Sequence, residues 1–154
     1  MSLIPAIVSF VQILTRRGAQ ATQNAMLVWP NKAVPTPVTS GSTTWVYGPW
    51  TQLIAANAIT TDYAVTAITI SGFATDSALD YQLELGTGNS PDELTKRPLS
   101  LHHDAEVGEG VVHIEFPIPM EVLANVRLAA VLACSSIASA KTLKVSVTTV
   151  PLPL

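Results

Sequence analysis

Apolar and polar residues alternate with a period of two over much of this chain. The clearest stretch covers residues 79–85, where Leu, Tyr, Leu and Leu alternate with Asp, Gln and Glu. A period of two places successive side chains on opposite faces of a strand, and an α-helix does not use it. The stretch therefore predicts a β-strand with one face in a core and the other in water.

Similar segments recur along the chain, separated by turn-forming sequences such as GTGNSPD at 86–92 and EVGEG at 106–110. They lie at residues 43–47, 51–55, 63–70, 111–116, 126–134 and 143–147. Seven or more short strands at this spacing are typical of an antiparallel β-sandwich or jelly roll. We therefore expect an all-β domain over residues 43–154.

One segment of this domain allows a second interpretation. Residues 120–133 (MEVLANVRLAAVLA) are rich in helix formers and could form an amphipathic helix. The apolar side chains at 126, 128, 130 and 132 keep the period of two, however. We predict a strand for the second half of the segment.

The beginning of the chain predicts an extended arm. Residues 3–14 (LIPAIVSFVQIL) are apolar on both alternate faces and rich in β-branched side chains, although Pro5 near the start also suits a short helix. A strand that is apolar on both faces must be covered on both. We expect the arm to lie on a neighbouring subunit through Leu3, Ile4, Ile7, Val8, Phe10, Val11, Ile13 and Leu14, with Arg16 and Arg17 pairing with acidic groups on a partner.

Residues 15–42 predict a connector rich in proline. Together with the arm before it, this connector makes up residues 1–42. Pro30, Pro35, Pro37 and Gly41 forbid a helix and disfavour a central strand. We expect contact with another molecule, and not its own hydrogen bonds, to order this segment. The apolar run before it is not typical of a secretory signal, because its basic residues follow it, and it is too short to span a membrane.

The composition predicts that other protein chains cover part of the surface. Only 12% of the residues are charged and 48% are hydrophobic, whereas an ordinary soluble domain is about a quarter charged. A length of 154 residues suits one core.

The net charge of -3 and the scattered basic residues argue against nucleic acid as a partner. The single cysteine, Cys134, allows no intrachain disulfide and is expected to be buried.

Catalytic and metal-binding patterns are weak. His102, His103 and His113 fall within a short acidic window with Asp104, Glu106, Glu109 and Glu115, which is the kind of cluster that a divalent metal uses. Adjacent histidines on an extended chain point to opposite faces, however, and cannot easily share one ion. No Gly-x-Ser-x-Gly motif occurs, and no lysine follows residues 86–88 (GTG) at the distance that a phosphate-binding loop requires. We expect a non-enzymatic protein without a metal or cofactor.

Three aromatic residues offer a binding alternative. Trp45, Tyr47 and Trp50 lie close together in TWVYGPW, and flat apolar ring faces can stack on sugar rings. Trp45 and Tyr47 are two residues apart and would project to one side of a strand. We expect them to anchor the core, with a carbohydrate platform as the alternative.

Residues 44–72, 81–95 and 111–136 together resemble a group of small virion proteins of tailed bacteriophages. The shared order is a Trp-containing strand, LIA-type, DY-V--I-I and LELGTG strands, a FPIP segment and a closing strand. The resemblance spans about residues 43–150 and is one of rhythm, without an invariant motif. It implies a capsid decoration (cement) protein or another external head or tail protein, commonly β-rich, commonly trimeric and without catalytic residues.

Several functional expectations come with this resemblance. The partners would be further copies of the chain and the major capsid protein, the location would be the outer capsid surface of a virion, and synthesis would take place in the host cytoplasm. The alternatives are a head-fibre or tail receptor-binding or carbohydrate-binding module, and a head-to-tail connector or tail protein. A trimer favours decoration, whereas a hexamer or dodecamer favours a connector.

Overall fold

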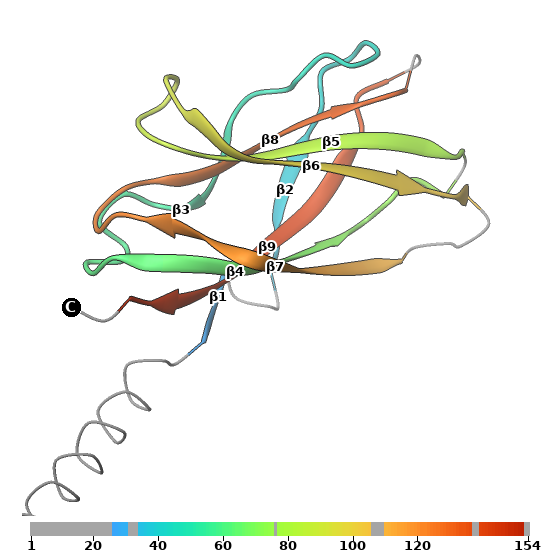
Figure 1. The fold of residues 1–154 in the computed structure, drawn as a ribbon. Coiled ribbons are helices and arrows are strands. Elements are labelled where there is room, and N and C mark those ends of the chain that lie inside the picture. The colour runs from blue at the N-terminus through green and yellow to red at the C-terminus, as the bar shows by residue number, and fades with distance from the viewer. Residues whose placement is uncertain (1–25, 31–33, 76, 106–109, 137–138, 153–154) are drawn as a thin grey trace, which may run out of the picture.

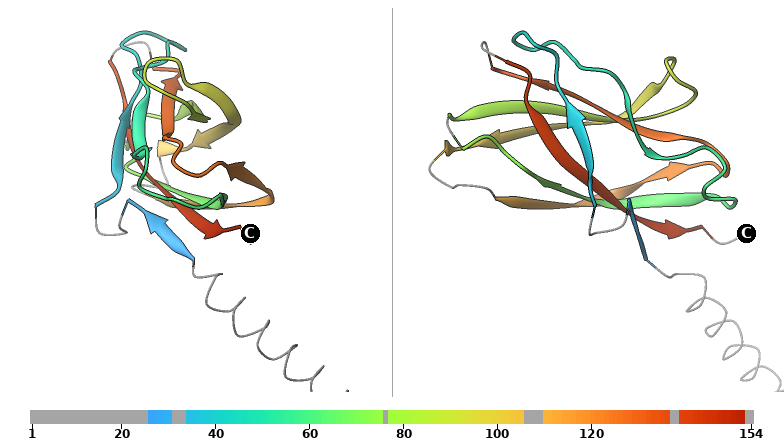
Figure 2. Two further views of the ribbon diagram at one scale, coloured as in Figure 1. Left: turned by 90° about the vertical axis from the view of Figure 1, so that its left-hand side faces the viewer. Right: turned by 180° about the vertical axis from the view of Figure 1, so that it is seen from behind.

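Two antiparallel sheets face each other in the part of the chain that the structure, a computed structural model, describes: residues 26–30, 34–75, 77–105, 110–136 and 139–152 (Figures 1 and 2). The five-stranded sheet contains β1 (Leu27–Trp29), β2 (Thr36–Thr39), β4 (Tyr63–Ser71), β7 (Val111–Val122) and β9 (Thr142–Pro151). The four-stranded sheet contains β3 (Thr51–Ile54), β5 (Leu79–Thr87), β6 (Leu94–His103) and β8 (Leu128–Cys134).

The strand order is that of a jelly roll. The five-stranded sheet has the order β1-β9-β4-β7, with β2 also paired to β9, and the four-stranded sheet has the order β3-β8-β5-β6. From β2 onward each strand crosses to the opposite sheet, except in the β5–β6 hairpin. The prediction of an all-β antiparallel sandwich with a jelly-roll arrangement is confirmed.

Alternate side chains of both sheets fill the core. Tyr81, Leu83 and Leu85 of β5 are at most 1% exposed and pack in one cluster with Ile68 and Ile70 of β4. The residues between them on β5 face outward, as the period of two predicts. β8 lies inside its sheet and is buried along its whole length, which includes the predicted burial of Cys134.

Part of the predicted connector belongs to the five-stranded sheet, so the expectation that it has no pairing of its own is wrong. β1 pairs with β9 through Leu27 and Thr149, and β2 pairs with β9 through Thr36 and Val145. Val38 of β2 is fully buried in the core. Pro37 is tolerated because the ladder pairs β2 with β9 alone, on the edge of the sheet. Residues 1–25 lie outside the described part of the chain.

Three other elements differ from the predictions. Residues 43–47 are not a strand: the chain turns at Thr44 and Trp45, and Trp45 has a positive φ of 59°. β6 was not predicted, because its Lys, Arg and Pro residues hide the alternation. The helix considered for residues 120–133 is absent, since β7 extends to Val122 and β8 begins at Leu128.

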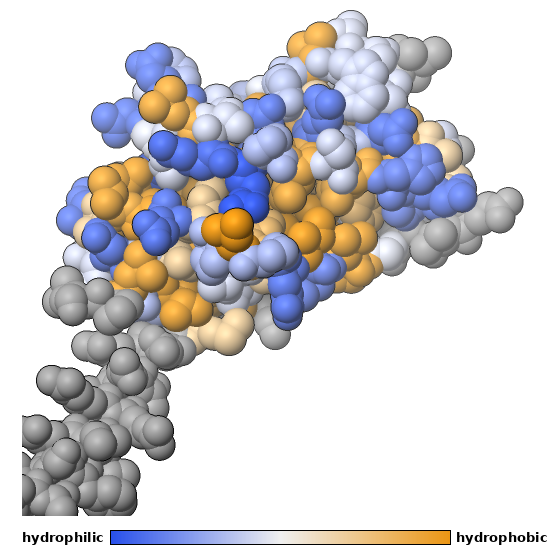
Figure 3. Space-filling view, viewed as in Figure 1, coloured by the Kyte–Doolittle hydropathy of each residue, from blue (hydrophilic) through white to orange (hydrophobic). Residues whose placement is uncertain are grey.

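Apolar side chains also reach the surface. The exposed large hydrophobic residues of the described chain are Met26, Leu27, Val34, Trp45, Val46, Tyr47, Leu94, Val111, Ile118 and Leu123. Figure 3 shows apolar residues at the surface between β6 and β7, interrupted by polar side chains. No helix in the described ranges has the length and apolar character needed to cross a bilayer.

Candidate functional site

The aromatic segment at residues 45–50 is held against the edge of β8 by backbone hydrogen bonds. The N–H of Trp45 donates to the carbonyl oxygen of Cys134 at 2.8 Å, and the N–H of Gly48 donates to that of Leu132 at 2.9 Å. A Cβ on residue 48 would lie 1.9 Å from the carbonyl oxygen of Thr39, so only glycine fits here. The backbone is fixed, and the aromatic side chains extend over the outer face of the four-stranded sheet.

Two of these side chains cross β8 and reach β5. The hydroxyl of Tyr47 donates to Oε1 of Glu84 at 2.5 Å, and the ring of Trp50 covers Gly86, where an added Cβ would lie 2.7 Å from the ring. Since β8 lies between β3 and β5, both side chains pass over it. The outward residues of β8 beneath them are small and buried: Ala129, Val131 and Ala133.

The prediction that Trp45 and Tyr47 anchor the core is wrong. Trp45 is 44% exposed and Tyr47 is 39% exposed, while Trp50 is half-buried. The turn before Trp45 and its positive φ break the strand alternation on which the prediction depended. The three aromatic residues form a surface ridge along residues 45–50, which we call the aromatic ridge.

A hollow of about 340 Å³ lies at the Trp45 end of the aromatic ridge. Its polar lining comes from outward positions of two neighbouring strands, because Asp80 of β5 pairs with His102 of β6, and Gln82 pairs with Ser100. Trp45 forms the aromatic wall. The aromatic signal could be found in the sequence, whereas the register between β5 and β6 that adds the polar side chains could not.

Two carboxylates fix the polar groups of this region. Nδ1 of His102 lies 2.6 Å from Oδ1 of Asp80, and this hydrogen bond, with the carboxylate charge, raises the pKa of His102 above its ordinary value. Burial, together with the hydrogen bond to Glu84, raises the pKa of Tyr47 to about 12. Glu84 also accepts a hydrogen bond from the hydroxyl of Thr95 at 2.5 Å. Tyr47 is therefore a neutral donor at physiological pH.

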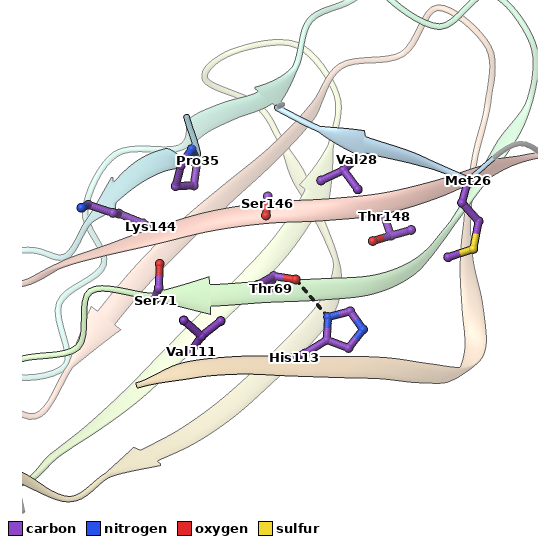
Figure 4. A pocket seen from close by; sticks show the side chains of 10 residues that line it. All are labelled: Met26, Val28, Pro35, Thr69, Ser71, Val111, His113, Lys144, Ser146 and Thr148. Carbon is purple, nitrogen blue, oxygen red and sulfur yellow. Dashed lines mark hydrogen bonds between the residues drawn. The ribbon is translucent and has the colours of Figure 1, made fainter. Parts of the chain in front are cut away.

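A groove of about 620 Å³ lies on the outer face of the five-stranded sheet (Figure 4). Its apolar lining comes from Met26, Val28, Pro35 and Val111. Hydroxyl side chains from β4 and β9 line it as well, together with Lys144 and His113: Thr69, Ser71, Ser146 and Thr148. The hydroxyl of Thr69 lies 2.9 Å from Nδ1 of His113. The groove is thus apolar along one part and able to form hydrogen bonds along the other.

The structure separates the three histidines of the acidic window. His103 is buried and stacks on Phe73, with ring centroids 4.6 Å apart. His102 and His113 lie on the outer faces of opposite sheets. Within the described residues no group of three or more His, Cys, Asp or Glu side chains is placed to hold a metal. Glu106 and Glu109 lie outside that part of the chain, as do the arm residues from Leu3 to Arg17, whose role stays a prediction.

Neither the family models nor the curated proteins contain a match to this sequence. Solved structures with a similar arrangement of strands include "CBM32 of AlyQ in complex with 4,5-unsaturated mannuronic acid", with 11% identity, a TM-score of 0.41 and coverage of 73% of this chain and 76% of that chain. They also include the CPMV top component, with 10% identity, a TM-score of 0.42 and coverage of 79% and 82%. The cryo-EM structure of Broad Bean Stain Virus is a third, with 9% identity, a TM-score of 0.38 and coverage of 83% of this chain and 97% of that chain.

Proposed function

We propose that the chain is a non-enzymatic virion structural protein: a capsid decoration protein that binds the outer surface of a phage head as a homotrimer. The resemblance of residues 43–150 to small virion proteins of tailed bacteriophages supports this function. The observation that carries it is the position of the groove. Met26, which lines the groove, lies only twelve positions after Leu14, the last apolar residue of the predicted arm.

The arm and the groove are complementary in chemistry. The arm offers apolar side chains on both faces, and the groove offers Met26, Val28, Pro35 and Val111. The hydroxyl residues of the groove can hydrogen-bond the backbone of an added extended segment. Exposed apolar surface of this kind commonly marks a protein–protein contact.

The length of the chain before the domain permits a contact between copies. Residues 15–25 separate Leu14 from Met26 and can span up to about 40 Å when extended. An arm can thus reach a neighbouring copy. Each copy carries both an arm and a groove, so identical contacts can close into a ring of three. A trimer then offers three equivalent attachment points to a shell, and their combined strength exceeds that of one.

Attachment to the particle tests this proposal. Purified full-length protein should sediment with phage heads that lack their own copies, whereas a variant without residues 1–17 should stay in the supernatant. Because the described strands all lie beyond residue 25, the truncated variant should keep its β-sheet circular dichroism spectrum. Full attachment of the folded truncated variant would contradict the role of the arm, and no attachment of the full-length protein would contradict the function itself.

A further inference from the structure

We infer that the hollow beside Trp45 is a binding site for a neutral saccharide, whose sugar ring stacks on Trp45 while its hydroxyls bond to Asp80, Gln82, Ser100 and His102. These side chains lie on the outer face of the four-stranded sheet, whereas the groove lies on the five-stranded sheet. The inference therefore stands independently of the proposed attachment to a capsid.

Trp45 has features that its packing does not account for. A left-handed backbone is unfavourable for a residue with a large side chain, yet Trp45 has a φ of 59°. Burial of this residue could offset the cost, but Trp45 is 44% exposed. Strained residues of this kind concentrate at binding and active sites. The strain directs an aromatic side chain to the wall of a hollow, where it can act as a stacking surface.

The opposite lining of the hollow suits sugar hydroxyls. A sugar hydroxyl both donates and accepts hydrogen bonds, and it needs partners of both kinds. The carboxylate of Asp80 accepts, the imidazole of His102 can do either according to its protonation, and the hydroxyl of Ser100 does both. Asp80 and His102 also hold each other at 2.6 Å, which fixes both groups before a ligand arrives.

The charge and size of the hollow select the ligand class. Neither lysine nor arginine lines it, and Asp80 disfavours a phosphate or another anionic group. Its volume of about 340 Å³ lies at the lower end of the range for ligand sites. A flat ligand with one apolar face and a polar rim fits this combination, and a neutral pyranose has this form.

The aromatic ridge extends the site beyond one sugar ring. The hydroxyl of Tyr47 donates a hydrogen bond to Glu84, and the ring of Trp50 packs on Gly86. Both rings therefore keep their positions along β5. Rings held at successive positions beside one strand can support successive units of an extended chain. The ligand is therefore expected to be an oligosaccharide, with Trp45 binding one unit most strongly.

A titration followed by nuclear magnetic resonance tests the inference with the full chain. The probes are neutral oligomers of glucose, galactose, mannose and N-acetylglucosamine, added in turn to ¹⁵N-labelled protein. We expect at least one series to cause saturable shifts of the Trp45 indole N–H and of the Asp80 and His102 amides. Trp45→Ala should weaken that binding about tenfold or more, and Trp45→Phe should keep part of it. The matched control is Leu123→Ala, which removes an exposed apolar side chain outside the hollow and should bind like the parent.

Two outcomes would overturn the inference. One is the absence of saturable shifts at these residues with every oligomer. The other is binding that Trp45→Ala leaves unchanged. If no oligomer binds and Trp45→Ala instead releases the protein from phage heads, the hollow is a contact with the shell and not a saccharide site.

Discussion

The guanidinium group of Arg97 lies over the ring of Phe116, with Cζ 4.7 Å from the ring centroid. Arg97 belongs to β6 at the edge of one sheet, and Phe116 belongs to β7 at the edge of the other. Nη2 of Arg97 also donates to the carbonyl oxygen of Ile118 at 2.7 Å. One side chain therefore joins the two sheets along this side of the sandwich.

Replacement of Arg97 should weaken the fold. Arg97→Ala removes a cation–π contact and a charged hydrogen bond, and we expect a loss of about 2–3 kcal/mol in the free energy of unfolding. Arg97→Lys keeps the charge without the planar group and should lose less. Urea unfolding measures both, with Lys96→Ala as the control because Lys96 is exposed on the same strand. Equal stability of Arg97→Ala and Lys96→Ala would show that the contact contributes nothing.

The ion pair between Glu93 and Arg127 joins the β5–β6 turn to the segment before β8. The side chain of Glu93 is fully buried, so Arg127→Ala leaves a buried carboxylate without its partner. We expect that variant to lose about 3–5 kcal/mol, and the double variant Glu93→Leu/Arg127→Leu to lose less than Arg127→Ala alone. Chemical denaturation of the two variants decides this, and a double variant as unstable as Arg127→Ala would contradict the explanation.

The contact with Asp80 should be visible in the titration of His102. Because the pKa of His102 is raised, its protonated form adds stability at pH values below the ordinary pKa, and this contribution is lost as the pH rises through the pKa of the folded state. In Asp80→Asn the pKa of His102 should fall back toward its ordinary value. Nuclear magnetic resonance of the imidazole protons measures both titrations. Identical titration curves in the two proteins would contradict the interaction.

The positive φ of Trp45 predicts an unusual order of stabilities. Glycine adopts this conformation without strain, so Trp45→Gly should be more stable than Trp45→Ala by about 0.5–1 kcal/mol. At Val46, where φ is not positive, the order should be the usual one, with Val46→Gly less stable than Val46→Ala. Thermal unfolding of the four variants provides the comparison. A less stable glycine variant at position 45 would rule out the strain that supports the saccharide site.

The sequence predicts the parts of the fold in which neighbouring residues carry the pattern. The alternation at residues 79–85 specifies β5, since its outward residues are polar and its inward residues apolar. β6 lacks such a pattern because Lys96, Arg97 and Pro98 interrupt it, and its place depends on its pairing with β5. β2 was missed because Pro37 argues against a strand, although an edge strand tolerates proline.

The candidate site was less predictable than the fold. Trp45, Tyr47 and Trp50 are evident as an aromatic cluster, but the turn that exposes them is a property of one backbone angle at Trp45. Asp80 and His102 are separated by a hairpin and become neighbours only through the register of β5 and β6. The groove likewise combines residues from both ends of the described chain, which no local pattern brings together.

The mass of the protein in solution tests the central claim, that copies of the chain associate through the apolar part of the groove. Sedimentation equilibrium of the full-length protein should give three times the chain mass of 16.3 kDa. Val111→Asp places a charge in the groove and should reduce the trimer to monomers. Ile118→Asp is the matched control, because Val111 and Ile118 lie on β7 and are 69% and 75% exposed, and Ile118 lies outside the groove. A full-length protein that stays a monomer of 16.3 kDa at high concentration would contradict the account.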